Sequence, residues 1–194
     1  MKLSIALASD SSQEWIDTVM GDFNSFLQDH ADCERKASAM AMSFVAKYPD
    51  RLEIIPELIE TAVEELDHFK DVYKLMERRG VSLPASMGQD IYIKKLIDHC
   101  RSDREGRFMD RLLLASIIEC RGAERFKLVA DALGEGEVKT FYKRLWTSEA
   151  KHGNIFVKMA LNYFEENDVY KRLVELNNYE SEVIKSLPLR AALH

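Results

Sequence analysis

Two stretches of the chain share one pattern, Glu65-Leu-Asp-His68 and Glu149-Ala-Lys-His152, and each lies in a segment with the apolar periodicity of a helix. Residues three apart on a helix lie on the same face, so each stretch presents a carboxylate next to an imidazole. Both groups bind divalent metal ions. The two stretches therefore predict metal-binding positions on two helices.

Two further glutamates extend the pattern into a repeat. Glu34 precedes Glu65 by 31 residues, and Glu119 precedes Glu149 by 30. The offset between the copies is 85 residues for the first glutamate and 84 for the Glu-x-x-His motif. A nearly constant offset indicates a duplicated helical hairpin, in which each copy supplies one glutamate and one Glu-x-x-His motif.

All four glutamates fall on seams in which apolar residues recur at alternating steps of three and four, as on the buried face of a packed helix. The seam around Glu34 contains Phe23, Leu27, His30, Ala37, Ala41, Phe44 and Tyr48. A buried carboxylate is costly unless it is paired or bound to metal, and the seams lack the Arg and Lys residues that could pair four of them. Two divalent cations held by four carboxylates and two neutral imidazoles would leave a nearly neutral site.

The same ligand set occurs in ferritin-like di-iron and di-manganese carboxylate proteins. We therefore expect an all-α, ferritin-like four-helix bundle, with a long crossover between its two hairpins and extra terminal helices, as a single domain over residues 1–194. The expected bundle helices span about 22–48, 52–79, 103–133 and 138–164. The expected further elements are a short helix after Ser11 or Ser12, a break at 81–88, a crossing helix at 89–101 and a last helix at 168–187.

Composition narrows the functional class. A hydrophobic fraction of 46% with 31% charged residues argues against disorder. The longest nearly apolar stretch, residues 37–46, is shorter than the roughly 18 residues that span a bilayer, so we expect a soluble, cytoplasmic protein with no membrane segment. Three cysteines, at positions 33, 100 and 120, lack zinc-type spacing and are interpreted as apolar fillers.

The predicted ligands divide into two groups, one for each metal ion. The first group is Glu34, Glu65 and His68, and the second is Glu119, Glu149 and His152. We expect at least one glutamate of the Glu-x-x-His motifs to bridge the ions. Carboxylates with imidazole suit Fe(II) or Mn(II), and the absence of thiolate ligands argues against zinc or copper. Iron is favoured, at two ions per chain, because a carboxylate-bridged iron pair can deliver two electrons to O₂ and oxidise a C–H bond.

Four segments carry a resemblance to a known family. They are Asp-His-Ala-Asp-Cys-Glu-Arg-Lys-Ala at 29–37, Glu-Glu-Leu-Asp-His-Phe at 64–69, Glu-Cys-Arg-Gly-Ala-Glu-Arg-Phe at 119–126 and Ser-Glu-Ala-Lys-His-Gly at 148–153. In these segments the chain resembles the tRNA 2-methylthio-N6-isopentenyladenosine hydroxylases. The resemblance covers nearly the whole chain, and all six ligand positions are intact.

The resemblance implies a reaction and its partners. A di-iron(II) site would activate O₂ and insert one oxygen atom into the isopentenyl side chain of the modified adenosine next to the tRNA anticodon. The second oxygen atom would leave as water. Each turnover needs two external electrons, so the resemblance implies an electron donor of the reductase or ferredoxin type.

The residues themselves give weaker support for tRNA binding. A net charge of −6 argues against a broad phosphate-binding face. The crossover region carries the candidate tRNA contacts Lys94, Lys95, Arg101, Arg104 and Arg107, diluted by nearby acidic residues. A base of the anticodon loop can be splayed out of single-stranded RNA, so a small basic patch beside the site would suffice.

Two other classes of protein stay open at this point. A ferritin-like ferroxidase or a peroxide-scavenging protein would use the same six ligands, although the chain has no Cys-x-x-Cys electron-transfer module. A metal-free structural bundle would place carboxylates on its seams without a cation. Metal content and assembly size distinguish these classes from the hydroxylase.

Overall fold

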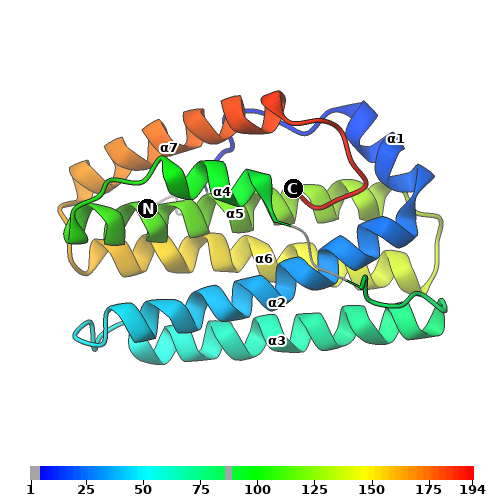
Figure 1. The fold of residues 1–194 in the computed structure, drawn as a ribbon, viewed down its shortest axis with the longest axis horizontal. Helices are drawn as coiled ribbons and strands as arrows, with labels where there is room; N and C mark the ends of the chain where they lie inside the picture. Colours follow the sequence, from blue (N-terminus) through cyan, green and yellow to red (C-terminus); the bar gives the residue numbers. More distant parts are fainter. Residues whose placement is uncertain (1–4, 86–88) are drawn as a thin grey trace. The chain divides into compact units, whose positions relative to one another are not determined.

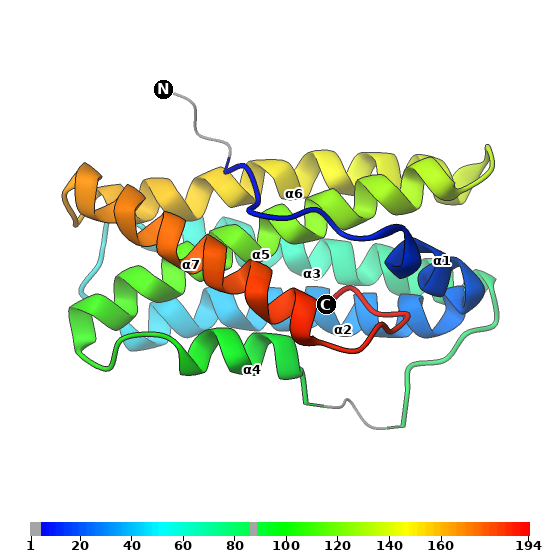
Figure 2. The same cartoon turned by 90° about the horizontal axis from the view of Figure 1, so that it is seen from above.

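The computed structural model describes residues 5–85 and 89–194, and within these ranges it contains seven helices and no strands (Figures 1 and 2). The helices are α1 (Gln13–Gly21), α2 (Phe23–Lys47), α3 (Ile55–Arg78), α4 (Ile91–Asp98), α5 (Arg104–Ala132), α6 (Glu137–Leu161) and α7 (Glu166–Ser186). The all-α prediction is confirmed. Residues 86–88 of the expected break lie outside the described residues.

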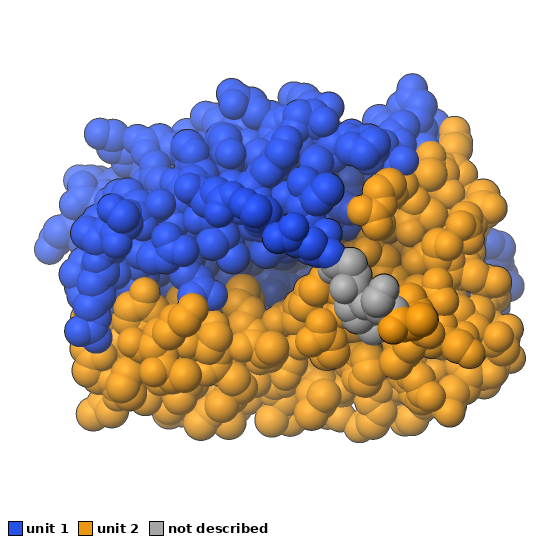
Figure 3. All heavy atoms as spheres, in the orientation of Figure 1, with its two compact units in different colours: residues 1–16, 89–189, 194 blue, residues 17–88, 190–193 orange. Residues whose placement is uncertain are grey.

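The chain divides into two compact units, which Figure 3 colours separately. Unit 1 comprises residues 1–16, 89–189 and 194, and unit 2 comprises residues 17–88 and 190–193. Each unit contains one of the expected hairpins, because α2 packs against α3 in unit 2 and α5 packs against α6 in unit 1. A single domain over the whole chain stays a prediction.

Local chemistry explains where the helices of unit 2 begin and end. The Asp22 side chain caps α2 by accepting a hydrogen bond from the Ser25 amide at 3.2 Å. The helix α3 begins at Ile55, three residues after the expected start, and Pro56 lies in its first turn, where a missing N–H costs nothing. Gly80, with a φ of +67°, follows its end.

Unit 1 is built around α5, which is buried on most of its circumference. The helix α6 packs on it, α7 also packs on it, and α4 lies against α7 (Figure 2). Asp103 caps the start of α5 by accepting from the Gly106 amide at 2.7 Å. The helix α6 ends at Leu161, three residues before the expected end.

A buried ion pair fastens α7 to α5. The Arg121 guanidinium donates to both oxygens of Glu180 at 2.9 Å, and neither side chain is exposed. The Tyr92 hydroxyl of α4 also donates to Glu180, at 3.1 Å. Bidentate geometry with a third hydrogen bond offsets the desolvation of both charges.

None of the helices in the described ranges is long and apolar enough to cross a membrane.

Candidate metal centre

In unit 2, α2 contributes Glu34 and α3 contributes Glu65 and His68. Both glutamates are buried, with 4% and 1% of their surface exposed, and His68 is partly buried. The His68 Nδ1 atom lies 3.5 Å from Glu65 Oε2 and 3.8 Å from Glu34 Oε2. One nitrogen and two carboxylate oxygens therefore face a common point within this hairpin.

In unit 1, α5 contributes Glu119 and α6 contributes Glu149 and His152. All three side chains are buried, and His152 Nδ1 lies 3.4 Å from Glu149 Oε2. One potential ligand atom from each of the three lies within 4.8 Å of the others. The second hairpin thus repeats the carboxylate and imidazole set of the first.

The spacing of these atoms fits ligands of a metal ion. Separations of 3.4 to 3.8 Å are longer than an ordinary N–H···O hydrogen bond of about 2.9 Å. Two atoms that bind the same ion at about 2.1 Å lie roughly 3 to 4 Å apart, depending on the angle between the two bonds. Oxygen and imidazole donors in a buried setting suit Fe(II) or Mn(II). The two clusters therefore indicate a metal site, and the binding of metal by each of the six residues stays a prediction.

A close approach of α6 to α5 positions His152. The Ser116 hydroxyl of α5 donates to the carbonyl of Gly153, the residue that follows His152. A Cβ atom at Gly153 would lie 2.5 Å from the Cys120 sulfur, so a larger residue there would force the Cys120 side chain or one of the helices to shift. The burial of Cys120 raises the pKa of its thiol to about 11, so the thiol stays protonated at neutral pH and acts as a packing group.

His30 is a buried polar residue next to the site that was not among the predicted ligands. Its side chain is fully buried, and its Nε2 atom lies 2.6 Å from Glu34 Oε1, one helical turn along α2. The seam pattern includes His30, but a seam position alone does not distinguish a hydrogen-bond partner from a core residue. Its spacing of four residues from Glu34 was the available signal.

The five candidate tRNA contacts lie on α4, on the loop after it and in the first turn of α5. Lys94 forms an exposed ion pair with Asp98, and Lys95 donates to Ser186 Oγ at 3.1 Å. Arg104 is exposed and Arg107 is half-buried. Contact of these residues with tRNA stays a prediction.

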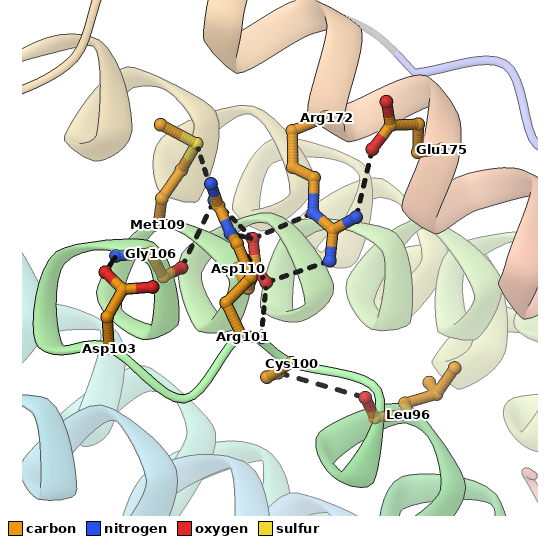
Figure 4. Close-up of polar contacts among 9 residues, drawn as sticks. All are labelled: Leu96, Cys100, Arg101, Asp103, Gly106, Met109, Asp110, Arg172 and Glu175. Atoms are coloured by element: carbon orange, nitrogen blue, oxygen red, sulfur yellow. Dashed lines mark hydrogen bonds and ion pairs between the residues drawn. The ribbon is translucent and has the colours of Figure 1, made fainter.

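Arg101 has a clear role within unit 1. Figure 4 shows its guanidinium and that of Arg172 on either side of Asp110. Arg101 approaches Asp110 Oδ1 to 2.6 Å, and Arg172 makes two bonds of 2.9 Å to the same carboxylate. Burial acts to raise the pKa of Asp110, but hydrogen bonds from Arg172 and Arg101 outweigh it and hold the pKa below its ordinary value. We call these three residues the Asp110 clamp, which ties the crossover loop and α7 to α5.

Comparison with known proteins identifies the family. The family model described as tRNA-(MS[2]IO[6]A)-hydroxylase (MiaE) matches residues 2–194. The chain belongs to this family. A MiaE-family relative from Pseudomonas putida, named tRNA 2-(methylsulfanyl)-N(6)-isopentenyladenosine(37) hydroxylase, is 36% identical over 93% of this chain and 87% of its own length. A relative of the same name from Salmonella typhimurium is 28% identical over 69% of this chain and 48% of its own length.

A solved structure supports the fold assignment for this MiaE-family chain. It is described as protein 43 with aldehyde deformylating oxygenase activity from Synechococcus. Its TM-score is 0.91, its sequence is 28% identical, and the match covers 97% of this chain and 94% of the solved one. The predicted ferritin-like fold class is thus confirmed, as is the resemblance found in the four sequence segments.

Proposed function

We propose that this protein is a tRNA hydroxylase that binds two iron ions per chain and uses O₂. Its substrate is the isopentenyl side chain of 2-methylthio-N6-isopentenyladenosine next to the anticodon. The observation that carries the proposal is the family match over residues 2–194, joined to one carboxylate and imidazole cluster in each hairpin. The oxygenase activity ascribed to the Synechococcus protein supports O₂ chemistry on this fold.

The protein's own groups account for metal binding. Glu34, Glu65 and His68 would hold one ion, and their counterparts Glu119, Glu149 and His152 would hold the other. Four ionised glutamates offset the charge of two divalent cations, and burial of these carboxylates keeps water from competing as a ligand. Each histidine presents Nδ1 to its neighbouring glutamate oxygen, so Nδ1 is the nitrogen that would bind metal in its neutral form.

A bound iron(II) pair would supply two electrons to O₂, so that one oxygen atom enters a C–H bond and the other leaves as water. The chain has no sequence module for electron transfer of the Cys-x-x-Cys kind. Two electrons for each further turnover would therefore come from an external reductase or ferredoxin-type donor.

The decisive experiment is nucleoside mass analysis of prenylated, methylthiolated tRNA after incubation with iron-loaded protein, a reductant and O₂. We expect the modified adenosine to gain one oxygen atom. Glu119→Ala and Glu65→Ala should abolish this gain because each removes a buried carboxylate of the metal clusters. Glu64→Ala is the matched control, since Glu64 precedes Glu65 on α3 but is exposed, and it should retain activity.

The other outcomes separate the competing functions. O₂ consumption and iron oxidation without any gain of oxygen on the nucleoside would overturn the tRNA hydroxylase and favour a ferroxidase or peroxide-scavenging protein. Failure to retain iron after loading under anaerobic conditions would overturn the metal centre as well.

A further inference from the structure

The two hairpins differ at the position four residues before their first glutamate. In the α2–α3 hairpin this residue is His30, and at the equivalent offset in the α5–α6 hairpin it is Ala115. Both residues are buried, with 0% and 1% of their surface exposed. At this position, four residues before the glutamate, only the first hairpin therefore carries a side-chain donor.

The contact between His30 and Glu34 has a defined direction. An ionised carboxylate only accepts hydrogen bonds, so a metal-binding Glu34 requires the hydrogen to lie on His30 Nε2. The separation of 2.6 Å is that of a strong, charge-assisted bond. The Phe26 ring lies 5.9 Å from the imidazole, and the low dielectric around these apolar neighbours strengthens the bond.

The two oxygens of Glu34 are thereby divided between two tasks. Oε1 accepts from His30, whereas Oε2 is the oxygen 3.8 Å from His68 Nδ1. The hydrogen bond occupies one lone pair of Oε1 and fixes the rotation of the carboxylate, so that Oε2 stays on the side of His68. Residue 115 cannot orient Glu119 in this way, because alanine has no side-chain donor.

We infer that His30 is a positioning residue: by donating to Oε1 it fixes the orientation of Glu34, so that Oε2 faces the metal ion of the α2–α3 hairpin. This inference rests on the metal-binding part of the proposed function. It gives the first glutamate of the α2–α3 hairpin a hydrogen-bond donor that Ala115, at the equivalent position of the α5–α6 hairpin, cannot provide.

The test uses the full chain and Co(II), whose visible absorption depends on its coordination. His30→Leu introduces an apolar side chain of similar size and removes the donor. We expect one of the two Co(II) affinities to fall by about 10 to 100-fold, as is typical when a hydrogen bond to a metal ligand is lost, with a changed absorption band for that ion. The other affinity should change by less than about twofold. His30→Gln, which keeps an N–H donor, should restore most of the affinity and the band.

Two variant backgrounds show which hairpin holds the Co(II) ion that His30→Leu weakens. In His152→Ala, which disables the α5–α6 cluster, His30→Leu should still weaken the remaining Co(II). In His68→Ala, which disables the α2–α3 cluster, it should have no effect. Leu27→Ala serves as a control, because it opens a cavity on α2 without removing a hydrogen bond, and its Co(II) affinities should match the wild type.

Three results would overturn the role of His30. They are equal weakening of both ions by His30→Leu, unchanged affinities and spectrum in His30→Leu, and a His30→Gln variant as weak as His30→Leu. A wild-type chain that binds no Co(II) would instead overturn the metal centre of the proposed function, so the two failures are distinguishable.

Discussion

The two hairpins carry the same cluster but have different surroundings. The α5–α6 hairpin is covered by α7 and α4, and among the described residues neither α5 nor α6 exposes a large hydrophobic side chain. The α2–α3 hairpin exposes Met42 on α2 and four large apolar side chains on α3. These four are Ile59, Val63, Leu66 and Tyr73.

This difference shows which features of a hairpin the metal ligands depend on and which they do not. Burial of the glutamates is alike in both copies, at 1% to 6% exposure, so the covering helices of unit 1 are not required to bury the ligands. Helices α4 and α7, which we call the cover of unit 1, are held in place by ion pairs of their own. These are Arg121 with Glu180 and the Asp110 clamp. The repeat therefore includes the helical hairpins and their ligands and does not extend to α4 and α7.

The largest expected effect comes from breaking the cover at Asp110. Asp110→Asn should destabilise the protein by about 3 to 5 kcal/mol at neutral pH, because it leaves two guanidinium groups facing a neutral amide. Urea unfolding measures the loss, and hydrogen exchange should show it first in α4 and α7. Asp98→Asn is the control, since its ion pair with Lys94 is exposed and should contribute less than about 1 kcal/mol.

The pH dependence of this effect has a definite sign. The folded-state pKa of Asp110 lies below the unfolded value, so its stabilisation is fully present above the unfolded pKa of about 4. The stabilisation is lost as the pH falls through the folded pKa. The stability difference between wild type and Asp110→Asn should therefore be constant near pH 7 and shrink below about pH 4. In the hydrogen-exchange measurement, an equal loss of protection in α2–α3 and α5–α6 of the Asp110→Asn protein would contradict a role of Asp110 confined to the cover.

The sequence predicted the repeated part of the molecule well and the cover poorly. Offsets of 84 and 85 residues and seam periodicity are visible in one chain, so the four long helices and the burial of Glu34, Glu65, Glu119 and Glu149 could be predicted. The pairing of Arg121 with Glu180 spans 59 residues and follows no period. Such contacts depend on how α7 lies on α5, which local pattern does not encode.

A smaller effect tests the close contact between α5 and α6 next to His152. Gly153→Ala should destabilise the protein by about 1 to 3 kcal/mol, because the new Cβ would meet the Cys120 sulfur. Cys120→Ala should relieve the clash, and a double-mutant cycle from urea unfolding measures the coupling.

Gly122→Ala is the matched control for this substitution. Gly122 is buried on α5, and nothing beyond its own helix backbone and chain neighbours lies within 4 Å of an added Cβ. The Gly122→Ala substitution should stabilise the protein by about 0.5 to 1 kcal/mol, because alanine has a higher helix propensity than glycine. Additive effects of Gly153→Ala and Cys120→Ala would rule out the contact as the cause.

The smallest expected effect tests the bare face of α3. Leu66 is 55% exposed, on the opposite side of α3 from His68, so Leu66→Ala should change the free energy of unfolding by less than about 0.5 kcal/mol. The same substitution at Leu112 on α5, which is 0% exposed, should cost about 2 to 5 kcal/mol. Both are measured by urea unfolding at two protein concentrations. A cost above about 1 kcal/mol at Leu66 that grows with protein concentration would mean that this face is buried against another copy in solution. The contrast between a covered and a bare hairpin would then hold for the single chain and not for the assembled protein.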